Sequence, residues 1–208
     1  MTVLYAATSN SGKLREFQKA APDFDVRALP VSIAPPDETG DTFEANAIQK
    51  ALTYSKHVDG YLFADDSGLA VDALGGAPGV YSARYAGTDF PERHANDAAN
   101  NALLLERLRG TTNRTARFVC VIALVRNGEL IKIFQGFVEG QIIDELRGGE
   151  GFGYDPLFYY EPFGCTFGEA SLEQKMKVSH RGLALDQMFT YLRNIASNAE
   201  SPRSSSRP

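Results

Sequence analysis

The sequence has few of the residues and segments that mark several large classes of protein. Its 208 residues include only two cysteines, Cys120 and Cys165, which form neither a CxxC pair nor a zinc-like cluster. Residues 1–5 have neither the basic nor the apolar region of a signal peptide, and no apolar run approaches the length of a membrane span. We therefore expect a cytoplasmic protein in which Cys120, inside the apolar run 118–124, is a buried free thiol.

An excess of positive charge is also missing. The chain has 21 Lys and Arg against 26 Asp and Glu, a formal net charge of -5. Non-specific binding of DNA or RNA needs a broad basic surface, so the sequence argues against nucleic acid as a partner. A nucleotide remains possible as a ligand, because a few Lys and Arg side chains with a metal ion can hold a triphosphate.

The length and the 43% hydrophobic content suffice for one domain with a core, or for two lobes that share a cleft. We expect residues 1–196 to form a single domain and Ser197–Pro208, rich in Ser, Pro and Arg, to be a disordered tail. Alternating strand and helix patterns predict an α/β fold, and Asn127-Gly128 between two apolar runs predicts a hairpin and hence a mixed sheet. The expected strands are 3–7, 24–29, 61–65, 116–126 and 129–138. The expected helices are 14–20, 42–57, 91–108 and 182–196, with Asp41 or Thr42 capping the second.

The first polar cluster, Thr8–Lys13, lies between an expected strand and an expected helix. Small residues there let backbone amides converge at the positive end of the helix, which suits phosphate, and Lys13 adds a full charge. A P-loop would need Gly at position 7 and Ser or Thr at 14, but the chain has Ala7 and Leu14. A plain capped helix is the alternative interpretation.

The second cluster is acidic. Its members are Asp37, Glu38, Asp41, Glu44, Asp65 and Asp66. Adjacent strand residues point to opposite faces, so Asp65 and Asp66 should have different roles. A carboxylate at a strand end beside Ser67-Gly68 suits a magnesium ligand, since Mg²⁺ takes oxygen ligands from one or two carboxylates, phosphates and water. We therefore interpret Asp66 as functional and Asp41 as an ordinary acidic residue at a helix start.

The third cluster is Gly151–Pro156. Its glycines allow a flat ligand to approach the backbone, Phe152 or Tyr154 could stack on a base, and Asp155 could accept a hydrogen bond. The alternative is a hairpin turn with core aromatics. The fourth cluster is Lys175 with His180-Arg181, three donors before a helix that could bind phosphate or a base carbonyl, unless they are ordinary surface residues.

These four clusters, in this order, resemble the inosine triphosphate pyrophosphatase family, the bacterial dITP/XTP pyrophosphatases in particular. The match runs from Val3 to Leu192. Its motifs are residues 7–13, 42–47, 64–85, 151–156 and 179–182. The resemblance implies an elongated central mixed sheet flanked by helices, two lobes with a nucleotide cleft between them, a homodimer and a need for Mg²⁺. It further implies hydrolysis of dITP, ITP and XTP to the monophosphate and pyrophosphate.

The resemblance also implies roles for individual residues. Asp66 would be the catalytic acceptor and a metal ligand, with Glu38 as the second ligand and Asp37 or Glu44 as alternatives to it. The substrate-binding residues would be Thr8, Ser9, Asn10, Ser11, Gly12, Lys13, Ser67, Phe152, Gly153, Tyr154, Asp155, Lys175, His180 and Arg181. A pyrophosphatase for modified pyrimidine or methylated nucleotides, and a nucleotide sensor without turnover, are the alternative functions.

Overall fold

The computed structural model describes residues 2–30, 33, 36, 38–87 and 92–200, the last three by their backbone alone. These residues form one seven-stranded sheet in the order β2-β1-β3-β4-β5-β6-β7. Strand β1 pairs in parallel with β2 and β3, and all later pairs are antiparallel, so the predicted mixed α/β sheet is confirmed. The strands are β1 (Val3–Ala6), β2 (Asp25–Ala28), β3 (Tyr61–Val71), β4 (Thr115–Arg126), β5 (Glu129–Ile142), β6 (Phe158–Tyr160) and β7 (Cys165–Thr166).

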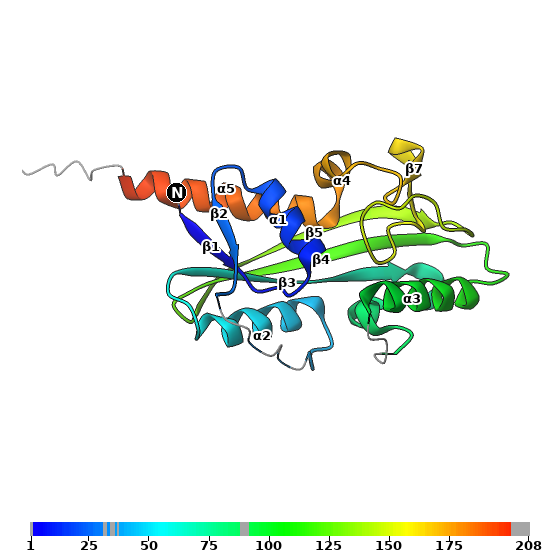
Figure 1. Cartoon of the computed structure of the whole chain (residues 1–208), viewed down its shortest axis with the longest axis horizontal. Coiled ribbons are helices and arrows are strands. Elements are labelled where there is room, and N and C mark those ends of the chain that lie inside the picture. The colour runs from blue at the N-terminus through cyan, green and yellow to red at the C-terminus, as the bar shows by residue number, and fades with distance from the viewer. Residues whose placement is uncertain (1, 31–32, 34–35, 37, 88–91, 201–208) are drawn as a thin grey trace, which may run out of the picture.

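Helices cover both faces of the sheet, whose three long strands β3–β5 run along the molecule (Figure 1). One face carries α1 and α5, and the other carries α2 and α3. The helices are α1 (Ser11–Ala20), α2 (Phe43–Ser55), α3 (Arg93–Arg107), α4 (Leu172–Val178) and α5 (His180–Glu200). Short 3-10 helices are η1 (Asp72–Leu74), η2 (Gly79–Arg84) and η3 (Glu161–Phe163). No helix in the described part of the chain is long and apolar enough to cross a bilayer.

Strand β3 is longer than the sequence predicts. It does not end at Asp65 but continues to Val71, because β4 pairs with all eleven of its residues. Gly68 therefore marks a close approach and not a turn: a Cβ added there would lie 2.3 Å from the hydroxyl oxygen of Ser82 in η2. The prediction that Asp66 lies at a strand end was wrong, and the acidic pair sits in the middle of β3.

The alternation of side chains along β3 places its acidic pair. Phe63 packs into the core under α1 and α5, whereas Leu62 and Ala64 pack into the core under α2. By the same alternation, Asp65 belongs to the α1/α5 face and Asp66 to the α2 face. The predicted opposition of the two carboxylates is confirmed.

Several local predictions hold, and others need correction. Thr42 caps α2 by accepting a hydrogen bond from the Ala45 amide at 3.1 Å, and Asn127 and Gly128 form the hairpin turn with positive φ. Cys120 is a buried free thiol, as expected. Helix α5 begins at His180 and continues to Glu200, so residues 197–200 are helical, while 201–208 lie outside the described residues. The short elements β6, β7 and α4 carry too few residues for a clear periodicity, and the sequence did not predict them.

Candidate active site

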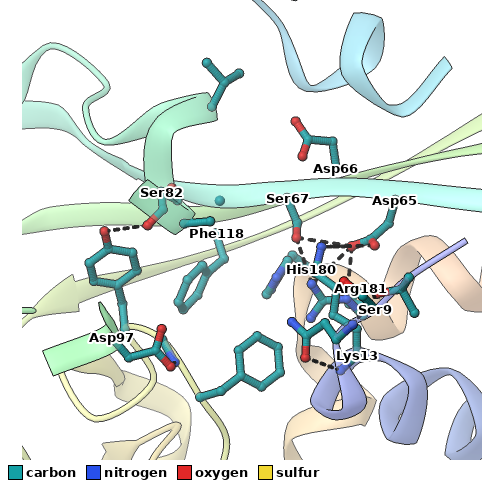
Figure 2. A pocket seen from close by; sticks show the side chains of 18 of the residues that line it. Ser9, Lys13, Asp65, Asp66, Ser67, Ser82, Asp97, Phe118, His180 and Arg181 are labelled. Carbon is teal, nitrogen blue, oxygen red and sulfur yellow. Dashed lines mark hydrogen bonds and ion pairs between the residues drawn. The ribbon is translucent and has the colours of Figure 1, made fainter. Parts of the chain in front are cut away.

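A cavity of about 390 Å³ opens beside β3. Its walls come from the loop before α1 and the start of α1, from α2, η2 and the start of α3, from the loop after β5, from α4 and from the start of α5. Figure 2 shows side chains that line it. Of the residues proposed from the sequence, it is lined by Thr8, Ser9, Asn10, Lys13, Glu38, Asp66, Ser67, Phe152, Gly153, Tyr154, Asp155, Lys175, His180 and Arg181. Segments far apart in sequence thus meet in one place, as the resemblance implied.

Two of the proposed phosphate-loop residues do not line this cavity. Ser11 is exposed, and Gly12 faces the ring of Phe152. The loop amides are also less available than expected, because Asn10 caps α1: its side-chain oxygen accepts from the amides of Gly12 at 2.9 Å and Lys13 at 3.1 Å. The capped-helix alternative therefore accounts for the backbone, and Lys13 supplies the charge.

On the α1/α5 face, Asp65 is surrounded by cations. Lys13 Nζ lies 3.0 Å from its carboxylate, and the Arg181 guanidinium donates to the same group at 3.2 and 3.3 Å. Burial raises the pKa of Asp65, but Lys13 and Arg181 outweigh it and hold the pKa well below its usual range. Burial lowers the pKa of Lys13, and Asp65 offsets only part of that. Asp65 is thus a permanently ionised anchor for the positive side chains.

Beneath this anchor lies a buried ion network. The carboxylate of Glu16 accepts from Lys175 Nζ at 2.9 Å and from Arg181 at 2.6 Å, and Lys175 also donates to Asp155 at 2.7 Å. Arg181 additionally donates to the Ser67 hydroxyl at 2.7 Å. Lys175, Arg181 and Asp155 line the cavity, and their charged groups have buried ionic partners because burial requires it. They form the floor of the site, and their contact with substrate stays a prediction.

On the α2 face, Asp66 belongs to a second cluster. Lys50 Nζ lies 3.0 Å from Asp66 Oδ1 and 3.0 Å from Glu38 Oε1, while Asn46 donates to Asp66 Oδ2 at 3.2 Å. Figure 2 shows Asp66 and Asp65 on opposite sides of the β3 ribbon. Burial raises the pKa of Asp66, and the charge of Lys50 offsets this only in part. A carboxylate of raised pKa that lines a cavity is a candidate general base.

The alternative metal ligands are placed differently from Glu38. Glu44 is exposed in the first turn of α2 and does not line the cavity, so it fits the role of an acidic residue at a helix start. Asp37 lies outside the described residues. Glu38 is held by Lys50 and by Arg84, whose guanidinium donates to Glu38 Oε2 at 3.0 Å. Glu38 is therefore the acidic loop residue that the structure brings to Asp66.

The far end of the cavity is aromatic. His180 stacks on Phe118 with ring centroids 4.7 Å apart, and burial together with Arg181 and Lys175 lowers the pKa of His180 well below its usual value, so the imidazole is neutral. The Phe152 ring lies 4.9 Å from the guanidinium of Arg93. Tyr154 is buried, and its hydroxyl donates to the Ser82 carbonyl at 2.9 Å, which leaves Phe152 as the ring available for stacking.

Sequence reasoning missed five charged residues in or beside the site, namely Glu16, Lys50, Arg84, Arg93 and Asp97. Lys50 had a detectable signal: it follows Asn46 by four residues on the buried face of α2, where a polar pair is unexpected. Arg93 and Asp97 show the same spacing at the start of α3. Glu16 precedes Phe17 on the buried side of α1. The sequence does not show which cations pair with a single buried carboxylate in a helix.

Comparison with known proteins identifies the family of the chain. The profile of the Ham1 family matches residues 4–191. The chain belongs to the Ham1 family. It is 49% identical over 187 residues to the dITP/XTP pyrophosphatase of Syntrophobacter fumaroxidans, covering 88% of this chain and 78% of that protein. It is 44% identical to the dITP/XTP pyrophosphatase of Listeria monocytogenes, covering 90% and 93% of the two chains.

Solved Ham1 structures agree with the fold described above. A HAM1 protein from Coxiella burnetii superposes with a TM-score of 0.82 at 40% identity, over 93% of this chain and all of that chain. The Staphylococcus aureus Ham1 protein gives 0.79 at the same identity and coverage. The expected family and its α/β fold are confirmed, and the Ham1 motifs that carried the resemblance are the segments that meet around β3.

Proposed function

We propose that this Ham1 protein hydrolyses the non-standard purine nucleotides dITP, ITP and XTP to the monophosphate and pyrophosphate. One observation carries the proposal. Within a single cavity, β3 presents a cation-anchoring carboxylate, Asp65, toward α1 and a carboxylate of raised pKa, Asp66, toward α2. Relatives at 44–49% identity are named dITP/XTP pyrophosphatases, which supports the same substrate class here.

Lys13 is the cation best placed to meet the triphosphate. Its side chain is 18% exposed, whereas the side chains of Lys175 and Arg181 are only 3% and 2% exposed and are fully paired in the floor of the site. Phosphoryl transfer depends mainly on positioning and neutralisation of charge. Lys13 would supply charge at the mouth of the α1 loop, with the Thr8 and Ser9 side chains beside it in the cavity wall.

The chemistry of the Asp66 cluster fits a divalent cation. Glu38 and Asp66 both reach one cationic centre, the ammonium of Lys50. No group of three or more His, Cys, Asp or Glu side chains within the described ranges could hold a metal by itself. Two carboxylates completed by substrate phosphates and water are a common arrangement for Mg²⁺. Asp66 and Glu38 would hold the ion, which when bound polarises a phosphoryl oxygen and neutralises developing charge.

In the proposed reaction, a water oxygen attacks the α-phosphorus and the bond to the β-phosphate oxygen breaks. Pyrophosphate leaves with the bonding electron pair, and the water proton passes to the carboxylate of Asp66. Lys50, whose pKa is raised because Asp66, Asp65 and Glu38 outweigh its burial, stays protonated and orients Asp66. A raised pKa brings Asp66 nearer the operating pH, which favours proton transfer.

Base choice follows from hydrogen bonding against the aromatic wall. Hypoxanthine and xanthine present an acceptor at position 6, where adenine presents a donor amine. A pocket that offers donors there leaves adenine with an unpaired donor, which costs far more than a missing methylene. We assign this selection to the region around Phe152 and the start of α5, where His180 lies.

We also propose a cytoplasmic homodimer whose residues 1–196 act as one two-lobed domain. The free cysteines suit a reducing compartment. Phe137, 58% exposed, and Leu183, 40% exposed, line one surface hollow on β5 and α5, and such a patch suits an interface. Sedimentation equilibrium measures the oligomeric state, and a concentration-independent monomer would exclude the dimer.

The deciding experiment measures pyrophosphate release from dITP, ITP, XTP, ATP and GTP, with Mg²⁺ and with EDTA. We expect rapid release from the first three, far slower release from ATP and GTP, and loss of turnover in EDTA. Orthophosphate as the first product would refute the reaction, and equal turnover of ATP would refute the specificity. Preferred turnover of modified pyrimidine nucleotides, or tight binding without turnover, would establish the corresponding alternative.

A further inference from the structure

Gly12 in the first turn of α1 lies directly against the ring of Phe152. A Cβ added to Gly12 would lie 2.8 Å from Phe152 Cδ1, closer than real Cβ atoms approach, and 3.1 Å from Phe152 Cε1, a tight contact. It would also lie 3.2 Å from the capping oxygen of Asn10. The backbone of Gly12 has no positive φ that would itself require glycine. The contact with Phe152 is therefore the feature that a side chain at position 12 would disturb.

The ring of Phe152 has little freedom to move away. The Phe152 amide donates to Asp155 Oδ2 at 2.8 Å, and the amide of Gly153 donates to Asp97 at 3.0 Å. The Gly153 carbonyl accepts from Asn101 at 2.9 Å. These bonds fix the loop backbone on both sides of Phe152, so a displaced ring must rotate instead of sliding with its loop.

Charged groups surround the same ring. Lys175 Nζ lies 5.0 Å from the ring centroid and the Arg181 guanidinium 5.6 Å, and both belong to the buried ion network. A ring pushed by position 12 would have to leave these cations or turn its edge toward them. The orientation of Phe152 is thus set jointly by the start of α1 and the floor of the site.

We infer that Gly12 is a positioning residue that sets the orientation of Phe152, and through it the affinity for the purine base. The inference rests on the proposed function, because it takes Phe152 as the stacking surface for the base. It gives Gly12 a role distinct from the phosphate contact that its sequence context suggested. It also couples the loop that precedes α1 to the base end of the cavity, since one residue touches both.

If position 12 affected only the stability of α1, Gly12→Ala would have a different result. Alanine is a better helix former than glycine and reduces the freedom of the unfolded chain, so Gly12→Ala should raise thermal stability if the new methyl met no obstacle. Our inference predicts a base-affinity defect even where the melting temperature is unchanged. Gly149→Ala is the matched control, because Gly149 has no positive φ and a Cβ there meets nothing within 4 Å.

The experiment compares wild type, Gly12→Ala, Gly149→Ala, Phe152→Ala and the double variant Gly12→Ala/Phe152→Ala. Steady-state kinetics with dITP give KM and kcat, and calorimetry gives the Kd of inosine monophosphate, which retains the base without the cleaved bond. We expect Gly12→Ala to raise KM and Kd about tenfold, the low end of what loss of base–aromatic stacking costs, with kcat changed less than about threefold. Gly149→Ala should match wild type.

The double variant separates the ring contact from every other effect of the methyl group. If Gly12→Ala acts through the ring, it has no further effect on KM or Kd once Phe152→Ala has removed that ring. Equal tenfold effects in both backgrounds, or unchanged KM and Kd in Gly12→Ala, would overturn the inference. A wild-type protein that binds inosine monophosphate but releases no pyrophosphate would overturn the proposed function alone, because the Kd comparison still tests Gly12.

Discussion

The two adjacent aspartates of β3 should respond to the same substitution in opposite ways. Asp66→Asn and Asp65→Asn each remove one negative charge and keep the size of the side chain. The pKa of Asp66 is raised because burial opposes its charge, so replacing that charge with the neutral amide of asparagine costs the fold little. The pKa of Asp65 is lowered, so the fold depends on its charge. Asp66 should therefore matter to turnover, and Asp65 to stability.

The magnitudes follow from the partners of each carboxylate. Asp66→Asn leaves Lys50 paired with Glu38, and we expect the free energy of unfolding to change by less than about 1 kcal/mol. Its kcat should fall at least roughly a hundredfold, the low end for loss of a general base. Asp65→Asn leaves Lys13 and Arg181 without their shared anion. Breaking such a buried pair costs about 3–5 kcal/mol, or roughly 6–20 °C in melting temperature for a chain of this size.

Calorimetry and pyrophosphate release, measured on the same preparations, test the predicted stability loss of Asp65→Asn and the predicted turnover loss of Asp66→Asn. Asp59→Asn, an exposed carboxylate on the turn before β3, is the control and should behave as wild type. An Asp66→Asn variant that turned over at the wild-type rate, beside an inactive but stable Asp65→Asn variant, would reverse the two assignments. Two active and stable variants would remove the acidic pair from the chemistry altogether.

Three further predictions concern the rest of the site and the chain end. Lys50→Met should lower kcat more than it raises KM for dITP, because it removes the cation that orients Asp66. Steady-state kinetics would show an effect on KM alone if Lys50 merely binds substrate. On acidification, kcat should decline before the fold does, because the pKa of Asp66 is raised and Asp66 is protonated first. Stability from the lowered pKa values of Asp65 and Glu16 is complete above about pH 5 and is lost progressively below it, so parallel pH profiles of kcat and melting temperature would contradict this order. Removing residues 201–208 should leave dITP turnover and melting temperature unchanged, and a loss of either would assign the segment a structural role.

Much of the fold could be predicted because its signals are local. The cap of α2 by Thr42 and the Asn127-Gly128 hairpin depend on residues within a few positions of each other. The opposition of Asp65 and Asp66 follows from strand geometry alone. The length of β3 could not be predicted in this way, because polar residues at 65–67 resemble a strand end and only pairing with β4 carries the strand through them.

In the candidate site, too, local features could be predicted and features that depend on distant partners could not. The motifs identified which segments would meet, and 14 of the proposed residues do line the cavity. Their roles depend on partners more than a hundred residues away, such as Glu16 with Arg181 and Asp65 with Arg181. Sequence motifs show that a lysine or arginine is present, but not whether its charge is already neutralised. For that reason the sequence could place Lys175 and Arg181 at the site but could not show that both are paired with buried carboxylates.

Positive and negative side chains are balanced on both faces of β3. On the α1/α5 face, the cations Lys13, Lys175 and Arg181 are matched by Glu16, Asp65 and Asp155. On the α2 face, Lys50 and Arg84 are matched by Glu38 and Asp66. Because both clusters are balanced, a triphosphate that enters finds oriented charges but no large excess of positive charge. Under the proposed function, a triphosphate would therefore gain most when it arrives with its own counterion, and a bare polyanion would be disfavoured. Under the same proposal, binding would depend on the base at the Phe152 end as well as on the phosphates, which is the condition under which a 6-oxo purine can be distinguished from an adenine nucleotide.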